Sequence, residues 1–262
     1  MSLIQFRAAA SRLRCGHCRY LATSCGPNPD YVNLTNAPTH YDNSAVVYPG
    51  FLSQEEGQAL VKEVSKRMKR RRFEDGHWDS VISKYREIEL ATPNEVDSDA
   101  SLSGNTSDIP QYVKTIQRAR DLLKSYAPPQ FTNQMTWLPC HAIDLSKDGR
   151  LDAHVDSVKF SGGIVAGISL LSDSIMRLRP AKGEWLDDTS DESSDGHYVD
   201  MYLPKLSLYC LHGMSRFHYS HELLPSDSVY QLHGKDVHVV RGRRLSIIFR
   251  DALVASKDAQ RN

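Results

Sequence analysis

The chain has 262 residues, of which 40% are hydrophobic and 24% are charged, as in ordinary globular proteins. Basic and acidic residues both number 32, so the formal net charge is +0 and the composition disfavours a general polyanion binder. The longest apolar stretch, at 164–171, is much shorter than the roughly 20 residues of a transmembrane helix, so we expect no membrane span. The 5 cysteines are too few and too unevenly spaced for a disulfide framework.

Residues 1–29 differ in composition from the rest of the chain. They contain no acidic residue, several alanines and serines, and four arginines: Arg7, Arg12, Arg14 and Arg19. This composition is typical of an organelle transit peptide, although a disordered basic tail is the alternative. Cys15 and Cys18 have the spacing of a redox dithiol, but no βαβ pattern surrounds them and we interpret the spacing as coincidental.

The remaining chain divides into three parts by composition. Residues 30–45 are polar and rich in turn formers, which predicts a linker. The periodic, apolar part of the sequence predicts one folded domain over 46–252, and a polar tail over 253–262 follows it. We therefore expect an organelle transit peptide at 1–29, a linker, one domain and a tail.

Two helices are predicted at the start of the domain. Ser53 and Glu56 form a capping box, and apolar residues follow at helical spacing, which predicts a helix over about 53–69. A second helix is predicted over about 110–126, where consecutive prolines stop it. The first helix ends in a basic run, 66–72, which we interpret as a solvated face, with a phosphate or nucleic-acid contact as the alternative.

From about residue 134 the sequence changes to short runs with strand character, separated by turn residues. Two helices followed by such strands predict a mainly β domain with flanking helices, a sandwich or jelly roll. Cys140 and Cys210 lie in these runs and are predicted to be buried thiols, and the acidic stretch 187–195 is predicted to be a solvated loop. The predicted strands are 134–145, 150–156, 163–171, 175–179, 205–211, 216–223 and 236–250.

A possible metal site begins with His154-Val155-Asp156. Residues two apart on a strand share a face, so His154 and Asp156 can bind one ion. His221 is the candidate third ligand, which would complete the two-histidine, one-carboxylate triad of non-haem Fe(II) oxygenases. A second His-x-Asp match at 77–79 has no strand run around it, and we interpret it as coincidental. Spacing alone leaves three alternatives to His221: His212, His218 and His233.

The last predicted strand alternates between two faces. Leu245, Ile247 and Phe249 form one face, which can pack in the core, and the other carries Arg244, Ser246, Ile248 and Arg250. Two arginines on one strand face are costly to bury without anionic partners. A guanidinium binds a carboxylate through two charge-assisted hydrogen bonds. Beside an Fe(II) site this pair predicts a dicarboxylate co-substrate, with an edge strand and solvated arginines as the alternative.

The combination of His154-x-Asp156, His221 and Arg244-x5-Arg250 resembles the AlkB family of Fe(II)/2-oxoglutarate dioxygenases, and most of all its mitochondrial branch. The resemblance runs from about 46 to 252, with its segments in the family's order. It implies a double-stranded β-helix (jelly roll) buttressed by the two N-terminal helices, and Fe(II), 2-oxoglutarate and O2 as cofactor and co-substrates. The matching segments are 154–160, 166–172, 176–178, 183–185, 207–209, 219–222 and 241–246.

The resemblance also implies a role for each matching residue. His154, Asp156 and His221 are expected to be the iron ligands. Arg244 is expected to hold the distal carboxylate of 2-oxoglutarate, and Arg250 to lie at the inner end of the co-substrate site. Two further residues are expected to contribute to this site: Tyr209, as a hydrogen-bond donor, and Ser246.

The sequence departs from the nucleic-acid-repairing members of the family in two ways. Those enzymes carry Asn-x-Tyr before the His-x-Asp motif, where this chain has Ile143-Asp144-Leu145. They also carry a long aromatic lid for nucleotide recognition, and the interval 129–141 is too short for one. Phe131 and Trp137 are the only large aromatic residues there, whereas a flipped base needs a stacking pocket.

These departures favour oxidation of a protein or small-molecule substrate in the mitochondrial matrix. The resemblance further implies a link to regulated necrosis and fatty-acid metabolism. Two alternatives stay open. In the first alternative, the same site demethylates mitochondrial RNA, and the basic run 66–72 contacts that RNA. In the second alternative, the domain is a non-catalytic module that binds iron and 2-oxoglutarate as structural or sensing ligands and acts through a partner.

Overall fold

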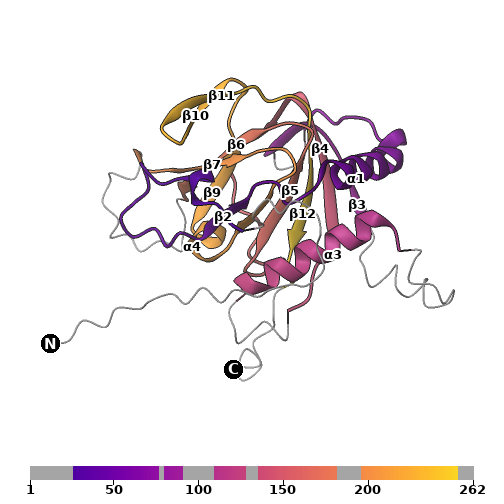
Figure 1. Cartoon of the computed structure of the whole chain (residues 1–262), viewed down its shortest axis with the longest axis horizontal. Helices are drawn as coiled ribbons and strands as arrows, with labels where there is room; N and C mark the ends of the chain where they lie inside the picture. Colours follow the sequence, from indigo (N-terminus) through magenta and orange to yellow (C-terminus); the bar gives the residue numbers. More distant parts are fainter. Residues whose placement is uncertain (1–25, 77–79, 91–108, 128–134, 182–195, 253–262) are drawn as a thin grey trace.

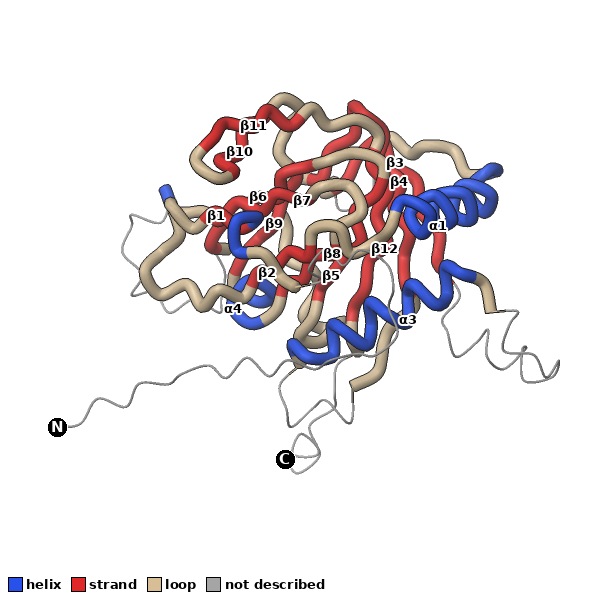
Figure 2. Tube along the Cα trace, in the orientation of Figure 1, coloured by secondary structure: helices blue, strands red, loops and turns tan. Residues whose placement is uncertain are grey.

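The computed structural model describes residues 26–76, 80–90, 109–127, 135–181 and 196–252. Its strands form two facing antiparallel sheets and a separate hairpin, and two helices lie across the outer face of the larger sheet (Figures 1 and 2). The larger sheet has the order β2-β8-β5-β12-β4-β3 and the smaller sheet the order β1-β7-β6-β9, while β10 pairs with β11. Within the described residues, no helix is both long and apolar enough to cross a lipid bilayer.

The elements have the following bounds. The helices are α1 (Gln54–Arg67), α3 (Gln111–Leu123) and α4 (Gly213–Phe217), with 3-10 turns η1 (Pro29–Tyr31), η2 (Met68–Arg70) and η4 (Lys124–Tyr126). The strands of the larger sheet are β2 (Ala45–Tyr48), β3 (Ile82–Leu90), β4 (Cys140–Leu151), β5 (Val165–Leu170), β8 (Leu208–Leu211) and β12 (Arg244–Arg250). The others are β1 (Val32–Asn33), β6 (Ser174–Pro180), β7 (Val199–Leu203), β9 (Tyr219–Leu223), β10 (Ser228–Leu232) and β11 (Lys235–Val239).

The two predicted helices are present. The capping box at the start of α1 has both of its hydrogen bonds, from the Glu56 amide to Ser53 Oγ (3.1 Å) and from the Ser53 amide to the Glu56 carboxylate (2.9 Å). The inner faces of α1 and α3 bury Leu60, Val64 and Ile116 against the larger sheet, in the first of the two main cores. This core fixes the sheet from behind and leaves its other face free to build a site.

Strand β12 lies in the middle of the larger sheet, between β5 and β4. Leu245, Ile247 and Phe249 pack in the core under the helices, as the alternation predicts. The opposite face of β12, with Arg244 and Ser246, therefore points between the two sheets. The buried thiols predicted at Cys140 and Cys210 are also confirmed.

Several parts of the sequence fold differently from the prediction. The predicted strand 236–250 is two strands, β11 and β12, and strands β2, β7 and β10 are not predicted by the sequence pattern. Strand β4 ends at Leu151, and residues 152–156 form a loop with a single β-bridge at His154, so the predicted strand 150–156 is wrong. The predicted strand 216–223 begins instead with α4, in which the Met214 amide is capped by the Asp42 carboxylate (3.1 Å). The sequence pattern does not predict strand β3, because its alternating charges, typical of an edge strand, mask the apolar positions.

The predicted linker 30–45 packs against the domain. Tyr31 stacks on Tyr202 of β7 with 5.7 Å between ring centroids, and Tyr41 is 8% exposed, its hydroxyl 2.6 Å from that of Ser215. The burial of these tyrosine rings explains why this polar stretch packs on the domain rather than forming an extended linker. The segments predicted as a transit peptide (up to residue 25), a second His-x-Asp motif, an acidic loop and a polar tail, together with Phe131, lie outside the described residues.

Candidate active site

The connection between β4 and β5 places two of the predicted ligands. His154 is fixed by an antiparallel β-bridge to His221, in which the amide of each residue donates to the carbonyl of the other, at 3.2 and 2.8 Å. Its Nδ1 lies 2.9 Å from the carbonyl oxygen of Asp152. A carbonyl can only accept a hydrogen bond, so Nδ1 is the protonated nitrogen and Nε2 keeps a lone pair for a metal.

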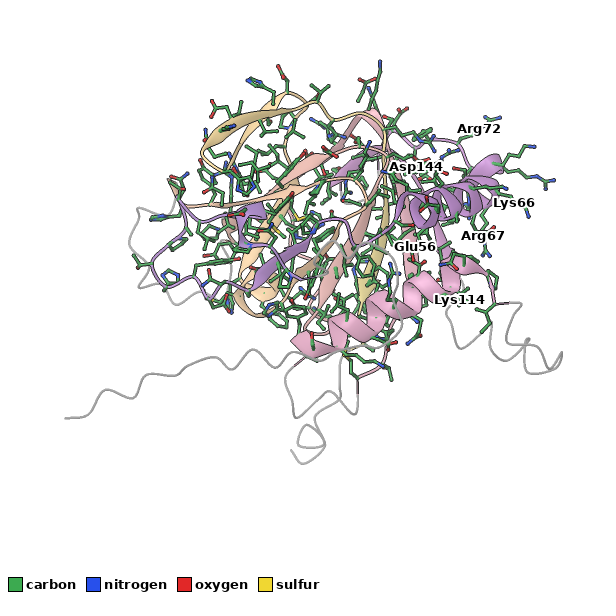
Figure 3. All side chains as sticks on the ribbon, in the orientation of Figure 1. Glu56, Lys66, Arg67, Arg72, Lys114 and Asp144 are labelled. Atoms are coloured by element: carbon green, nitrogen blue, oxygen red, sulfur yellow. The ribbon has the colours of Figure 1, made fainter. Side chains whose placement is uncertain are left out.

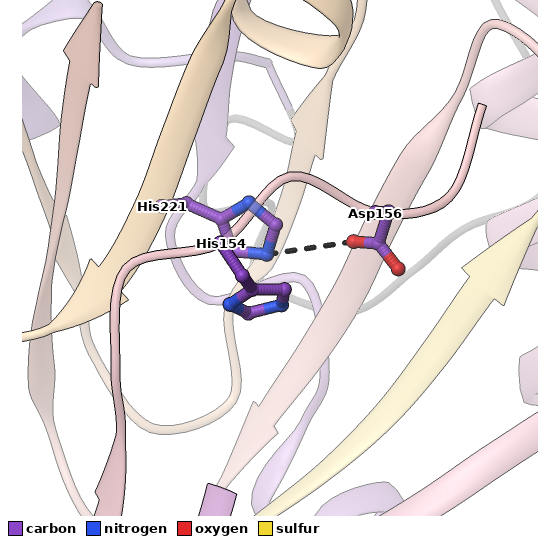
Figure 4. A group of neighbouring side chains, drawn as sticks. All are labelled: His154, Asp156 and His221. Carbon is purple, nitrogen blue, oxygen red and sulfur yellow. Dashed lines mark ion pairs between the residues drawn. The ribbon is translucent and has the colours of Figure 1, made fainter. Parts of the chain in front are cut away.

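The three predicted ligands converge (Figure 4). The ligand atoms of His154, Asp156 and His221 all lie within 4.8 Å of one another, and His221 Nε2 is 3.5 Å from the Asp156 carboxylate. His221 comes from β9 of the smaller sheet, whereas the other two come from the loop after β4. The described residues contain no other group of three His, Cys, Asp or Glu side chains this close together.

The alternative histidines lie elsewhere. His212 packs against Tyr126, with 4.8 Å between the ring centroids, and the exposed His233 lies 3.4 Å from Asp30. His218 is the C-terminal cap of α4, where its amide donates to the Met214 carbonyl. Tertiary structure therefore selects His221 from the four candidates.

The electrostatics of the triad suit a divalent cation. Burial, together with the neighbouring His154, lowers the pKa of His221 to about 3, so its imidazole is neutral and able to donate a lone pair. For Asp156, burial raises the pKa, but Arg250, His221 and His154 outweigh it and lower the pKa to about 2. A buried neutral imidazole beside an ionised carboxylate is the donor chemistry of a non-haem Fe(II) site.

Arg250 holds the carboxylate of Asp156, the third predicted ligand. Its Nε donates to Asp156 Oδ1 at 2.7 Å, and its Nη2 lies 2.5 Å from the same oxygen. The other carboxylate oxygen, Oδ2, is the one that approaches His221. Arg250 thus fixes the rotamer of Asp156 and leaves its other oxygen facing the imidazole of His221.

Arg244 lies at the other end of the same pocket. It is 3% exposed, and its guanidinium donates to the hydroxyls of Ser169 (2.8 Å) and Ser174 (3.2 Å). Burial lowers the pKa of Arg244, an effect that the neighbouring Tyr209 opposes. Hydroxyl partners do not neutralise a buried guanidinium, so this position fits a ligand carboxylate.

Tyr209 and Ser246 line the same pocket between the two ends. Burial raises the pKa of Tyr209, which keeps its phenol protonated as a hydrogen-bond donor. Ser246 is 2% exposed, and its hydroxyl lies 3.5 Å from the carbonyl oxygen of Ile143. The remaining wall is largely apolar, formed by Ile82, Ile143, Leu145, Leu151, Val165, Leu223 and Ile248.

Ile143-Asp144-Leu145, which stands where the resemblance places Asn-x-Tyr, has a mixed role. Ile143 and Leu145 point into the pocket and make its wall apolar. Asp144 points away and is fully buried between Arg86 (2.8 Å) and Arg243 (2.7 Å). The strand alternation of β4 thus separates an apolar pocket wall from an ion-pair cluster that stabilises the sheet.

Sequence reasoning missed two residues next to the site. Gly167 of β5 lies opposite Tyr209, and a Cβ there would be 2.7 Å from the tyrosine ring. Arg216, in the segment predicted as a strand, is buried behind the Asp156 loop. A glycine or an arginine within an apolar run indicates a position with a special packing role. The sequence does not show, however, which residue each of them contacts in the folded chain.

Comparison with known proteins identifies the family. A family model described as the 2OG-Fe(II) oxygenase superfamily matches residues 44–250. The chain belongs to this superfamily. The mitochondrial alpha-ketoglutarate-dependent dioxygenase alkB homolog 7 of Mus musculus is 36% identical over 208 residues, covering 79% of this chain and 78% of that protein. The Bos taurus homologue is 34% identical over 211 residues, with the same coverage.

This superfamily member is an AlkB-like dioxygenase that uses Fe(II), 2-oxoglutarate and O2. A solved Pseudomonas putida prolyl-4-hydroxylase shares its fold, with a TM-score of 0.50, 14% identity, and coverage of 81% of this chain and 94% of that one. The mainly β jelly roll with flanking helices, expected from the sequence, is therefore confirmed.

Proposed function

We propose that His154, Asp156 and His221 hold the Fe(II) of this dioxygenase, and that Arg244 binds the distal carboxylate of 2-oxoglutarate. The observation that carries the proposal is the pocket itself. Its wall contains three converging ligand atoms and a buried guanidinium whose hydrogen-bond partners are hydroxyls. When bound, the iron would supply oxidising chemistry in which O2, 2-oxoglutarate and the substrate are converted to succinate, CO2 and the oxidised substrate.

The chain's own residues orient the proposed metal ligands, bind the co-substrate and exclude water from the site. Arg250 holds Asp156, and the His154–His221 bridge sets the two imidazoles. Tyr209 and Ser246 offer hydroxyls along the co-substrate, next to Arg244. The apolar wall keeps water from the space between the ligands and Arg244, which strengthens the electrostatic interactions within it.

We propose a protein side chain or a small molecule as the substrate. Two features of the chain support this. Trp137 is partly buried against the core under the helices, and Arg120 lies over its ring at 5.8 Å, which disfavours stacking on a base. The pocket wall is apolar at Ile143 and Leu145, where the nucleic-acid-repairing enzymes carry Asn-x-Tyr.

We further propose that the protein acts in the mitochondrial matrix after removal of a transit peptide at 1–29, in regulated necrosis and fatty-acid metabolism. The acid-free, arginine-containing start of the sequence and the names of both mitochondrial relatives support the location. Import of the full chain into isolated mitochondria, followed by protease protection in mitoplasts and N-terminal sequencing, tests it. Retention at the mitochondrial surface would contradict the matrix assignment.

A second candidate, RNA demethylation, is favoured by one feature. Lys66, Arg67 and Arg72 project from the C-terminal end of α1 and the segment after it (Figure 3). Arg67 is engaged by Glu63 and Tyr112, whereas Arg72 is exposed. If RNA binds here, its affinity falls steeply with salt and is lost when Lys66 and Arg72 are made neutral.

The decisive experiment compares wild type with Asp156→Ala in mitochondria. Mass spectrometry of protein, metabolites and RNA follows the gain of one oxygen or the loss of one methyl group. A protein or metabolite change supports the first proposal, and an RNA change supports the second. A non-catalytic module would give full cellular activity with Asp156→Ala and no such change.

A further inference from the structure

Arg216 is among the largest fully buried side chains in the described residues and is 2% exposed. It lies on α4, and its guanidinium donates hydrogen bonds to one short segment, 156–162. Nη1 donates to the Asp156 carbonyl (2.9 Å) and Nε to the Gly162 carbonyl (3.1 Å). Nη2 donates to the Ser161 hydroxyl (2.8 Å) and to the carbonyls of Ser157 (3.2 Å) and Ser161 (3.4 Å).

The segment that carries Asp156 is therefore wrapped around a single cation. Burial lowers the pKa of Arg216, and its hydrogen-bond partners are neutral oxygens. An arginine buried in this way is costly compared with an apolar residue that would fill the same space. Its three nitrogens satisfy four carbonyls and one hydroxyl of a loop that has no strand assignment over 156–162.

Both ends of this loop are held at the end of β12. The Asp251 carboxylate accepts from the amides of Gly163 (3.1 Å) and Ile164 (2.8 Å), and the Asp251 carbonyl accepts from Gly162 (2.8 Å). The preceding residue, Arg250, holds the Asp156 side chain (2.7 Å). The loop is thus fixed at its first and last residues by β12, and Arg216 fills the space between them.

The helix that carries Arg216 is anchored as firmly. The Ser215 hydroxyl lies 2.6 Å from that of Tyr41 and 2.9 Å from that of Ser44. Helix α4 leads directly into β9, which carries His221. One short stretch of chain therefore supplies His221 and also holds the backbone of Asp156.

We propose that Arg216 is a positioning residue that sets Asp156 relative to His221 through the backbone of the ligand loop. This inference rests on the proposed function, because it takes both residues as metal ligands. It predicts that loss of Arg216 weakens divalent-metal binding more than the loss of an equally buried arginine elsewhere. Arg244, the proposed 2-oxoglutarate anchor, lies on β12, away from this loop. The KM for 2-oxoglutarate at saturating metal is therefore expected to change little in the Arg216 variant.

The test measures Co(II) binding to metal-free full-length protein by calorimetry and by the visible absorption spectrum, which reports the coordination geometry. Arg216→Ala is expected to weaken Co(II) binding about 10- to 100-fold and to alter the spectrum, as for other groups that orient metal ligands. Arg216→Lys, or methylguanidinium added to Arg216→Ala, is expected to recover part of the affinity. The matched control is Arg120→Ala, because Arg120 is also buried, at 3% exposure, but binds the Leu138 carbonyl (3.0 Å) under α3.

The outcomes separate the two proposals. If wild type binds no Co(II), or if His154→Ala binds it as tightly as wild type, the proposed metal site is wrong. If wild type binds Co(II), His154→Ala does not, and Arg216→Ala binds like Arg120→Ala, the role of Arg216 is wrong. Should Arg216→Ala not fold, Ser161→Ala decides instead, because it removes one acceptor of the guanidinium (2.8 Å); an unchanged affinity and spectrum would overturn the inference.

Discussion

His154 and His221 exchange two backbone hydrogen bonds, of 3.2 and 2.8 Å, although no strand continues from His154 on either side. This isolated bridge ties the loop after β4 to β9 at the two proposed imidazole ligands and leaves 4.2 Å between their ring centroids. The positions of the proposed ligands are therefore set by backbone hydrogen bonds in the protein itself, which would limit the conformational entropy lost on metal binding.

The triad is tested by removal of its carboxylate. Asp156→Ala is expected to lower both Co(II) affinity and 2-oxoglutarate turnover by at least about 100-fold, because it removes a ligand rather than a supporting group. The control is Asp152→Ala, since Asp152 contacts His154 through its carbonyl alone (2.9 Å). Calorimetry and succinate release measure the two effects, and an Asp156→Ala protein with wild-type turnover would contradict the assignment.

Arg244→Met is expected to raise the KM for 2-oxoglutarate about 30-fold or more, since loss of one partner of a buried charge pair costs about 2–5 kcal/mol of binding. Arg244→Lys keeps the charge but not the two-pronged geometry, so an intermediate KM is expected. Arg179→Met is the control, because Arg179 is half-exposed beside Glu222 (3.3 Å). An unchanged KM in Arg244→Met, measured by succinate release, would exclude Arg244 as the carboxylate anchor.

Gly167→Ala tests the close approach of β5 and Tyr209. The added Cβ would lie 2.7 Å from the tyrosine ring, so Tyr209 must move. We expect a loss of about 1–3 kcal/mol in the free energy of unfolding, together with a higher KM for 2-oxoglutarate. Gly163→Ala, whose Cβ meets no atom within 4 Å, is expected to change stability by less than about 0.5 kcal/mol in urea unfolding. Equal effects in both variants would contradict the packing argument.

Asp144 is predicted to stabilise the fold without taking part in catalysis. It is fully buried between Arg86 and Arg243, so Asp144→Asn leaves two guanidinium groups without their carboxylate. We expect the free energy of unfolding to fall by about 3–5 kcal/mol in urea titrations. Glu63→Gln, which breaks the part-exposed pair with Arg67 (2.8 Å), is expected to cost less than about 1 kcal/mol. A stable Asp144→Asn protein would show that this cluster contributes little.

The raised pKa of Tyr41 predicts that the free energy of unfolding depends on pH in the alkaline range. Burial raises its pKa to about 12, against the opposing hydrogen bond from Ser215, whereas an unfolded tyrosine titrates near about 10. Below the unfolded pKa both states keep the proton, and above it only the folded state does, so stability falls as the pH rises from about 10 to 12. Tyr41→Phe is expected to reduce this slope in urea unfolding, and an identical slope would contradict the prediction.

The sequence by itself determined the elements whose evidence is local. The Ser53–Glu56 capping box marks a helix start because its partners are neighbours in the chain. The alternation of β12 places Ile247 in the core and sets Arg244 on the opposite face, because side chains alternate along every strand. The chemistry of Arg244 and of the His-x-Asp motif could likewise be predicted, because it belongs to the residue types themselves.

Only the tertiary structure decided how distant groups meet. His221, rather than three other histidines, is bridged to His154, and Arg216 meets the Asp156 loop only in the folded chain. Edge strand β3 is recognised only through its pairing with β4. The physical reason is that periodicity records which side chains are buried, whereas sheet register and loop closure determine which of them touch, and these depend on contacts between segments far apart in the chain.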